Sequence, residues 1–340
     1  MVWHPPRVAS SVDELTTGAT DRVEITPDDG KSGSRYWTLC IDDQRYFLKT
    51  VSYESDWLMR VTGDLDHRTW KIWTKGLMEH APAAIDHTVV GMALEGTGTS
   101  ATLGQLMRDV GDHLVPEGDE PLTAEEHAGF IDAMADLSAT FWGWDDAIGL
   151  KPLEDRPRFF APDNIAAELA SGDVPGPIAA ADAGWTRLPE RAPGVARVTA
   201  EIHRDPGPIT RALRTTPPTF LHGDWKAGNL GRHPDGRTIL LDWAYPGSGP
   251  ACWDLTWYLS LNAARLPESK DDVIERFRGA LESRGIDTRD WWDTQLDLSL
   301  LDMTACMGWE KALGSDEELA WWVDRVERAA PRVPELASLL

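Results

Sequence analysis

The spacing of the apolar residues changes near residue 111, and this change constrains the fold more than any other feature of the chain. Before it, aromatic and β-branched residues form short runs between turn residues, as at Tyr46–Val51. Such runs predict antiparallel strands. After it, apolar residues recur at helical spacing, as over Phe130–Phe141. We therefore expect an α+β protein with a β-rich N-terminal lobe (1–108) and a larger helical lobe (109–340).

Helix signals refine this expectation in three places. Between residues 56 and 79, Trp70, Trp73 and Leu77 recur at i, i+3 and i+7, which predicts one helix with a buried stripe. The motif Thr123-x-x-Glu126 has the spacing of a capping box and predicts the start of another helix. Residues 150–220 are rich in Pro, Gly and Ala, so we expect short helices joined by turns there.

The composition excludes several classes of protein. Hydrophobic residues make up 42% and charged residues 26% of the chain, as in a folded globular protein. The formal net charge of −23 would repel nucleic-acid phosphates and anionic lipid, so we expect neither nucleic acid nor a membrane as a partner. The same charge would attract a cationic ligand such as an amino sugar, although it serves solubility equally well.

The cysteines and the hydropathy of the chain indicate in which cellular compartment the protein is expected. Cys40, Cys252 and Cys306 are widely spaced and form no Cys-x-x-Cys pair, which argues against a disulfide framework or a cysteine zinc site. The N-terminus shows no basic region followed by an apolar stretch, and no segment approaches the ~20 apolar residues that span a bilayer. We expect a soluble cytoplasmic protein.

The segment from His222 to Asn229 carries the chemistry that the sequence indicates. It reads His-Gly-Asp-Trp-Lys-Ala-Gly-Asn and lies between two expected strands, Thr219–Leu221 and Thr238–Leu241. The carboxylate of Asp224 suits acceptance of a proton from an attacking hydroxyl. The amide oxygen of Asn229 can ligate magnesium without placing a second full negative charge beside the phosphates.

A second carboxylate, Asp242, follows the apolar run Ile239–Leu241. A carboxylate at a strand end is well placed to hold a metal that bridges nucleotide phosphates, because Mg²⁺ prefers hard oxygen donors. The alternative is a polar turn without catalytic role, since Asp-x4-Asn is frequent by chance. The order and spacing of the two elements together favour phosphoryl transfer.

With these motifs the sequence resembles the aminoglycoside phosphotransferase and choline kinase-like family, which shares the fold of the protein kinases. The resemblance covers most of the chain in outline, and its specific motifs lie within residues 220–260. It implies a bilobal protein-kinase-like fold, with the nucleotide-binding lobe at 1–108 and the catalytic loop and acceptor site in 109–340.

The resemblance also implies roles for individual residues. Asp224 would be the catalytic base, and Asn229 and Asp242 would ligate Mg²⁺. Asp254, which takes the place of a third family motif, and His222 would brace the catalytic loop by hydrogen bonds. One departure is that Trp243-Ala244-Tyr245 follows Asp242 in place of Phe-Gly. Together with the missing Ala-Pro-Glu of an activation segment, it argues against a protein kinase.

Lys49 takes the place of the family's lysine that contacts the α- and β-phosphates. It lies in the expected strand Tyr46–Val51, where burial of an unpaired ammonium costs several kcal/mol. The alternative is an edge-strand lysine that points to water. The acid that should pair with Lys49 is not clear from the sequence, and Glu54 and Asp64 are the candidates.

Two backbone segments take the places of nucleotide-contacting segments in the family. The loop Gly30–Ser34 has small residues whose N–H groups can approach phosphate oxygens, although the pattern Gly-x-Gly-x-x-Gly is absent. Leu106–Val110 takes the place of the hinge whose backbone binds the purine. The nucleotide-contacting candidates besides Lys49 are Ser32, Gly33, Ser34, Met107 and Asp109.

The expected function is transfer of the γ-phosphoryl group of ATP or GTP, with Mg²⁺, to a hydroxyl of a small molecule. An amino sugar or aminoglycoside-like acceptor fits the acidic charge. Kinases for choline-like alcohols or plain sugars remain alternatives, and so does a nucleotide-binding kinase-like module without turnover.

Overall fold

The structure is a computed structural model that describes residues 6–26, 32–172 and 174–340. The chain divides into two compact units. Unit 1 comprises Met1–Asp119 and Ala227–Tyr245, and unit 2 comprises Glu120–Lys226 and Pro246–Leu340. Unit 1 is therefore discontinuous in sequence, and it extends beyond the expected lobe 1–108 by residues 109–119 and 227–245.

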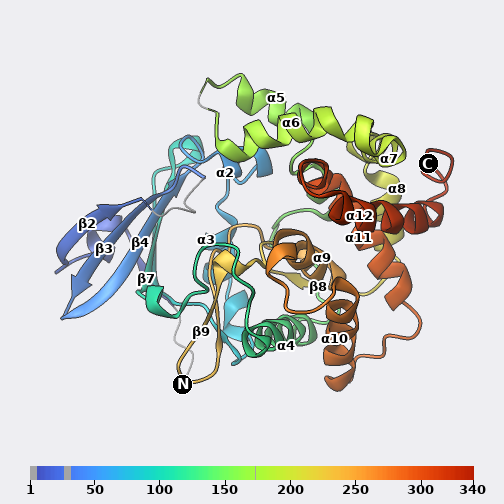
Figure 1. The fold of residues 1–340 in the computed structure, drawn as a ribbon. Helices are drawn as coiled ribbons and strands as arrows, with labels where there is room; N and C mark the ends of the chain where they lie inside the picture. Colours follow the sequence, from blue (N-terminus) through green and yellow to red (C-terminus); the bar gives the residue numbers. More distant parts are fainter. Residues whose placement is uncertain (1–5, 27–31, 173) are drawn as a thin grey trace. The chain divides into compact units, whose positions relative to one another are not determined.

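Unit 1 is built on a mostly antiparallel sheet in the order β1-β6-β7-β4-β3-β2 (Figure 1). Only β1, which runs parallel to β6, departs from the antiparallel pattern within this sheet. The register places Lys49 between Tyr36 and Gln105, in the middle of the sheet. The strands are β1 (Arg7–Ala9), β2 (Thr20–Ile25), β3 (Arg35–Ile41), β4 (Gln44–Ser52), β6 (Val89–Glu95) and β7 (Thr102–Arg108).

The single helix expected between residues 56 and 79 is wrong. The structure has three separate segments there, α2 (Trp57–Thr62), α3 (Arg68–Thr74) and the 3₁₀ turn η1 (Leu77–His80). Gly63 ends α2 in the left-handed conformation (φ 66°), which a continuing helix cannot contain. His67 precedes α3 with φ 51°.

The buried side of this region also differs from the expected stripe. Ile72 and Trp73 of α3 are buried, whereas Trp70 and Leu77 are only half-buried. The spacing i, i+3, i+7 predicts a shared face only if the helix is continuous, and the turn at Gly76 (φ 73°) separates Leu77 from α3.

A second, small sheet in unit 1 has the order β5-β10-β9. β9 (Leu230–Arg232) and β10 (Thr238–Leu240) form an antiparallel hairpin in which Leu230 pairs with Leu240. β10 also pairs in parallel with β5 (Ile85–Asp86). The later chain segment is thus joined to the N-terminal part of unit 1 by strand pairing.

Unit 2 is mainly helical, as expected for the C-terminal part (Figure 1). Its long helix α11 contacts α6, α9 and α12 and is buried along most of its length. A Cβ atom at Gly184 of α6 would lie 2.2 Å from the carbonyl oxygen of Trp309, so α6 and α11 cross closely. The α-helices are α4 (Ala124–Thr140), α5 (Pro162–Leu169), α6 (Gly176–Arg191), α7 (Pro193–Arg204), α8 (Gly207–Leu213), α9 (Cys252–Leu261), α10 (Lys270–Ser283), α11 (Trp292–Leu313) and α12 (Asp316–Ala329).

Several local predictions for unit 2 are confirmed. Thr123 and Glu126 form the capping box at the start of α4, with both reciprocal hydrogen bonds present. Ala124–Thr140 then buries the expected apolar face. Helices α5 to α8 occupy the stretch 150–220, although α6 has 16 residues and is longer than the short helices expected.

The two strands expected on either side of the His222 motif both exist but belong to different sheets. β8 (Pro218–Leu221) pairs with β11 (Gly247–Pro250) in unit 2, whereas β10 lies in the small sheet of unit 1. The motif therefore starts in one compact unit, and its last residues, from Ala227 onward, belong to the other.

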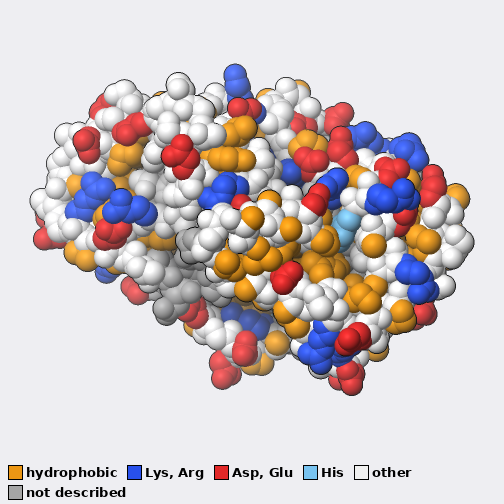
Figure 2. All heavy atoms as spheres, turned by 90° about the horizontal axis from the view of Figure 1, so that it is seen from above, with side chains coloured by type: hydrophobic (Ala, Val, Ile, Leu, Met, Phe, Trp, Pro, Cys, Tyr) orange, Lys and Arg blue, Asp and Glu red, His pale blue; other side chains and the backbone are white. Residues whose placement is uncertain are grey.

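The surface and the helices bear on the expected partners. On the face seen in Figure 2, basic and acidic side chains are interspersed, and hydrophobic side chains gather around a hollow. The excess of acidic residues is thus not visible there as one continuous patch. Among the helices of the described ranges, none combines the length and apolar character needed to cross a bilayer.

Candidate active site

In unit 1, Lys49 and Asp242 form an ion pair. The Nζ atom of Lys49 on β4 lies 3.0 Å from Oδ1 of Asp242. Asp242 comes two residues after the end of β10 at Leu240. The side chain of Lys49 is 12% exposed. Burial by itself would lower the pKa of Lys49, but the charges of Asp242 and Asp56 help raise it above its ordinary value. The lysine therefore stays charged in its buried position.

Asp242 adopts a left-handed backbone conformation with φ 57°. Asp tolerates this region better than most residues, yet it remains a conformation that the surroundings must hold. The backbone N–H of Leu241 donates to the carbonyl of Asn229 (2.8 Å), so the hairpin fixes the chain immediately before Asp242. Such an outlier next to an ion pair points to a functional position.

The hairpin also brings Asn229 beside Asp242. Because Leu230 pairs with Leu240, Asn229 lies opposite Leu241, next to Asp242. An amide oxygen and a carboxylate are ligands that suit Mg²⁺, which usually takes one or two carboxylates plus phosphate oxygens and waters. In the described part of the chain, no group of three His, Cys, Asp or Glu is arranged as a metal site. In the type of their donor atoms, Asn229 and Asp242 fit a magnesium ion.

The acid that accompanies Lys49, besides Asp242, is Asp56. It is 2% exposed, caps α2 by accepting the N–H of Met59 (3.0 Å), and accepts a hydrogen bond from the Ser34 hydroxyl (3.0 Å). Burial raises the pKa of Asp56, while hydrogen bonds from Ser32, Met59 and Ser34 and the charge of Lys49 oppose this shift. Asp56 was missed from the sequence because it occupies a helix cap before α2, where acids are common for local reasons.

Both acids considered for Lys49 from the sequence have other partners. Glu54 is exposed and accepts a hydrogen bond from the Thr99 hydroxyl (3.0 Å). Asp64 accepts the backbone N–H of Arg68 at the start of α3 (2.8 Å) and lies 3.7 Å from its guanidinium group. Asp56, at the N-cap of α2, and not Glu54 or Asp64, is the second acid whose charge raises the pKa of Lys49.

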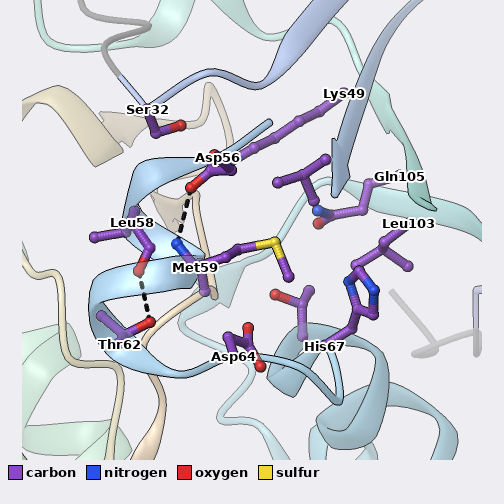
Figure 3. Close-up of a pocket in the computed structure, with 13 residues that line it drawn as sticks. Ser32, Lys49, Asp56, Leu58, Met59, Thr62, Asp64, His67, Leu103 and Gln105 are labelled. Atoms are coloured by element: carbon purple, nitrogen blue, oxygen red, sulfur yellow. Dashed lines mark hydrogen bonds between the residues drawn. The ribbon is translucent and has the colours of Figure 1, made fainter. Parts of the chain in front are cut away.

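A pocket opens beside Lys49 and Asp56, between α2, α3 and the sheet (Figure 3). Met59 and Leu103 contribute apolar walls, and Gln105 points toward the interior from β7. His67 lines the opposite end, and burial lowers its pKa so that the ring is neutral near pH 7. The pocket therefore places the ammonium of Lys49 and the carboxylate of Asp56 at one end of a mostly apolar space.

The small-residue loop lies against the start of α2. The carbonyl of Ser32 accepts the N–H of Trp57 (2.9 Å), and Gly33 has φ 103°. A Cβ atom at Gly33 would lie 2.1 Å from the carbonyl oxygen of Ser55, so only glycine fits there. Ser32 and Ser34 thus bind the acid Asp56 of the same unit. Gly30 and Lys31, the first residues of the expected loop, lie outside the described residues.

The expected hinge segment is held by its neighbours in unit 1. Met107 pairs with Phe47 on β4 and with Val89 on β6. The N–H of Asp109 donates to the carbonyl of Arg45 (3.3 Å), and its carboxylate forms an ion pair with the same arginine (2.8 Å). The N–H of Asp109 is therefore already donated to a backbone carbonyl.

In unit 2, Asp254 organises the loop that carries Asp224. From the first turn of α9 it accepts the backbone N–H groups of His222 (2.9 Å) and Gly223 (2.8 Å). Nδ1 of His222 accepts the N–H of Asp224 (3.1 Å), which places the ring proton on Nε2. Burial raises the pKa of Asp254 to about 6, opposed by these hydrogen bonds and by the charge of Arg156.

Both carboxylate oxygens of Asp224 have donors. The indole N–H of Trp257 donates to Oδ1 (2.9 Å), and Nζ of Lys226 lies 2.9 Å from Oδ2. Trp257 and Asp254 are one helical turn apart on α9, so both reach the same loop. Trp257 was missed from the sequence. The one sequence feature that links Trp257 to the loop is its i+3 spacing from Asp254. Buried helix residues commonly have that spacing, so it did not single out Trp257.

The sequence and the fold of the chain were compared with those of known proteins. The family model described as the phosphotransferase enzyme family matches residues 103–292, more than half of the chain. No curated protein sequence matches the chain significantly. Similar solved structures include a microcompartment-associated aminopropanol kinase, with 15% identity, 94% coverage of each chain and a TM-score of 0.50.

Two further similar structures are the aminoglycoside phosphotransferase APH(4)-Ia with ADP and hygromycin B, and the choline kinase LicA from Streptococcus pneumoniae. The first has 11% identity, covers 94% of this chain and 97% of that chain, and has a TM-score of 0.47. The second has 12% identity, covers 95% and 96%, and has a TM-score of 0.49.

The likeness to the aminopropanol kinase confirms the expected fold class, which is α+β and kinase-like, with a sheet-rich N-terminal region and a helical C-terminal part. At 15% identity it speaks to the fold alone. The match to the family model covers the motif that contains Asp224 and its partners. The chain belongs to the phosphotransferase enzyme family.

Proposed function

We propose that this protein is a small-molecule kinase that transfers the γ-phosphoryl group of ATP or GTP to an alcohol, with Mg²⁺. The observation that carries the proposal is the ion pair of the largely buried Lys49 with the partly exposed Asp242, 3.0 Å apart, with Asn229 held next to Asp242 by the β9–β10 hairpin. A cation, a carboxylate and an amide oxygen so placed are the groups that a nucleotide triphosphate with its metal requires.

In the proposed mechanism, the residues of unit 1 bind the nucleotide end. Lys49 would contact phosphate oxygens, and Asp56 together with Asp242 keeps its ammonium charged and oriented. Asn229 and Asp242 would hold Mg²⁺, which neutralises negative charge on the phosphates when bound. Ser32, Gly33 and Ser34 would lie along the phosphates, and Met107 and Asp109 would border the purine.

Asp224 in unit 2 would act on the acceptor. The acceptor oxygen forms a bond to the γ-phosphorus as the bond from that phosphorus to the β,γ-bridging oxygen breaks, and the nucleoside diphosphate leaves. The hydroxyl proton passes to the carboxylate of Asp224. The donors on both carboxylate oxygens fix the direction from which the hydroxyl can approach, so that much of the rate gain would come from positioning.

The acceptor that we propose is a hydroxylated amine, with amino sugars and aminoglycoside-like compounds first. This rests on the net charge of −23, which favours cationic ligands over anionic ones. Choline-like alcohols and plain sugars are the next candidates. The free, widely separated cysteines fit a reducing compartment, and we place the enzyme in the cytoplasm.

A nucleotide-binding module without turnover is the rival function. The sequence left it open because it did not single out the acid that pairs with Lys49. The charge of Asp56 acts on Lys49, and both carboxylate oxygens of Asp224 have donors, which supports an enzyme.

The test is a coupled assay of nucleoside diphosphate release. Purified protein is given ATP or GTP and Mg²⁺ with a panel of amino sugars, aminoglycosides, choline-like alcohols and plain sugars, and Asp224→Asn serves as the blank. We expect acceptor-dependent release from at least one cationic alcohol by the wild type alone. Release that is equal in wild type and Asp224→Asn for every acceptor would overturn the proposal.

A further inference from the structure

We propose that Trp257 is a positioning residue for Asp224: its indole N–H holds one carboxylate oxygen and thereby sets the rate of the transfer step. The inference rests on the proposed role of Asp224 as the base. It concerns a residue that no motif marks, because Trp257 reaches the loop from the second turn of α9.

The geometry of the contact is that of an oriented donor. Nε1 of Trp257 lies 2.9 Å from Oδ1 of Asp224, and the side chain of Trp257 is buried at 4% exposure. An indole has a single N–H and no acceptor, so this bond has one polarity only. The terminal torsion of an aspartate is broad, and a fixed donor on one oxygen narrows it.

Aromatic neighbours hold the indole itself. The ring of Trp253 stacks on that of Trp257 with centroids 5.1 Å apart and an interplanar angle of 23°. Phe159 stacks at 6.0 Å and 28°. Two nearly parallel neighbours restrict rotation of the indole about its side-chain bonds, so the N–H cannot easily turn away from Asp224.

Trp253 is in turn anchored in the interior of unit 2. Its own indole N–H donates to Oδ2 of Asp302 on α11 (2.9 Å), and the guanidinium of Arg156 lies 4.5 Å from its ring centroid. All three side chains are buried. A chain of contacts therefore runs from α11 through two stacked indoles to the carboxylate of Asp224.

The two carboxylate oxygens of Asp224 have partners of different kinds. Oδ1 receives a neutral donor from the buried side, while Oδ2 faces Lys226, whose side chain is 39% exposed. Loss of the indole N–H would leave nucleotide-binding residues untouched, since Lys49, Asn229 and Asp242 belong to unit 1. The effect is therefore expected in kcat and not in the KM for nucleotide.

The test replaces Trp257 by phenylalanine, which keeps an aromatic ring but removes the donor. Trp322→Phe is the matched control, because Trp322 is also buried in unit 2 and donates its indole N–H to a carboxylate, Oε1 of Glu318 (2.8 Å), on α12. We expect kcat to fall about ten-fold or more in Trp257→Phe with both KM values within about two-fold of wild type. Trp322→Phe should keep the wild-type kcat.

A double variant separates positioning from packing. If Trp257 acts through Asp224, adding Trp257→Phe to Asp224→Asn should cause no further loss of rate. Circular dichroism and thermal unfolding confirm that each variant is folded, and Trp257→Leu, which also lacks a donor, replaces Trp257→Phe if the latter fails to fold.

The outcomes distinguish this inference from the proposed function. A wild-type kcat in Trp257→Phe, while kcat falls strongly in Asp224→Asn, would overturn the role of Trp257 and leave the function intact. An equal fall of kcat in Trp257→Phe and Trp322→Phe, or a further fall in the double variant, would also overturn it. Full activity of Asp224→Asn would instead reject the function on which the inference rests.

Discussion

The two units hold their main carboxylates in different ways. In unit 1, Asp242 is paired with the buried ammonium of Lys49 and sits in a left-handed backbone conformation. In unit 2, Asp224 is held by a neutral indole N–H on one oxygen and by the half-exposed Lys226 on the other. One carboxylate thus faces a buried charge, and the other faces mainly hydrogen-bond donors and solvent-accessible charge.

This difference fits the two tasks that we propose. A carboxylate that binds a metal must stay ionised, and a buried cation such as Lys49 favours that state. A carboxylate that accepts a proton needs a fixed direction, because a small misplacement of the reacting atoms slows the transfer. The same residue type therefore serves binding in unit 1 and proton acceptance in unit 2, according to its partners.

The largest expected effect separates the two carboxylates. Asp224→Asn should lower kcat by a factor on the order of 10²–10⁴, the usual range for loss of a general base, with nucleotide affinity nearly unchanged. Steady-state kinetics and titration calorimetry with Mg²⁺ and a nucleotide would measure both quantities.

The counterpart in unit 1 is Asp242→Asn, which keeps an oxygen for Lys49 but removes the charge. It should weaken Mg²⁺-dependent nucleotide binding in the same calorimetric experiment. If Asp242→Asn binds the nucleotide like wild type, or if Asp224→Asn loses nucleotide binding, the contrast between the two units is wrong.

A smaller effect is expected for the acid that accompanies Lys49. Asp56→Asn should raise the KM for nucleotide about ten-fold, because the amide no longer attracts the ammonium, while it can still cap α2. Glu54→Gln is the matched control, since Glu54 is exposed and its carboxylate accepts a hydrogen bond from the Thr99 hydroxyl. A larger effect of Glu54→Gln than of Asp56→Asn would restore the partner that the sequence favoured.

The buried carboxyl of Asp302 in unit 2 should make stability depend on pH. Burial raises its pKa to about 7 from an ordinary 3.8, opposed by the Trp253 hydrogen bond and the charge of Arg156. Between these values the folded state binds more protons than the unfolded state, so the free energy of unfolding falls as pH rises. The slope from this one group approaches about 1.4 kcal/mol per pH unit.

Chemical denaturation of wild type and Asp302→Asn at pH 5 and pH 8 would test this. The amide can still accept the indole N–H of Trp253 but does not titrate. We expect wild type to lose more stability than Asp302→Asn between the two pH values. Parallel losses in both proteins would show that the carboxyl is not held neutral by burial.

The smallest expected effect concerns the start of α4, to which we assign no part in the reaction. Thr123→Ala removes the side chain that accepts the N–H of Glu126 and should cost about 1 kcal/mol of stability. Thermal unfolding would show a Tm lower by a few degrees, and kcat should stay at the wild-type value. A change in kcat would mean that the start of α4 influences Asp224, which lies in the same unit.

The sequence predicted the local elements where the signal is itself local. The runs at Tyr36–Ile41 and Tyr46–Val51 became β3 and β4, and the capping box at Thr123 formed as expected. The fold class followed from the change of periodicity near residue 111 and from the motif at His222. These features depend on residues close together in the chain, where spacing reflects geometry directly.

Contacts between distant segments could not be predicted in this way. Asp56 follows Lys49 in the same stretch of chain, but its place beside the lysine depends on the turn after β4, in which the N–H groups of Ser55 and Asp56 donate to the carbonyl of Ser52. Trp257 reads as one more apolar residue of α9, and its bond to Asp224 depends on how the helix packs against the loop. The prediction of one helix between residues 56 and 79 was wrong because Gly63 and Gly76 adopt left-handed conformations. The spacing of the aromatic residues did not indicate these two breaks.

The discontinuity of unit 1 limits how the protein can be cut. A fragment that ends at Asp119 would lack β9 and β10, so β5 would lose its parallel partner and present an open edge to other chains. The same fragment would contain Lys49 without Asp242. A fragment with all of unit 1 would need residues 227–245 joined behind residue 119 by a short linker, which amounts to deleting residues 120–226 from within the gene, and simple truncation would not produce it.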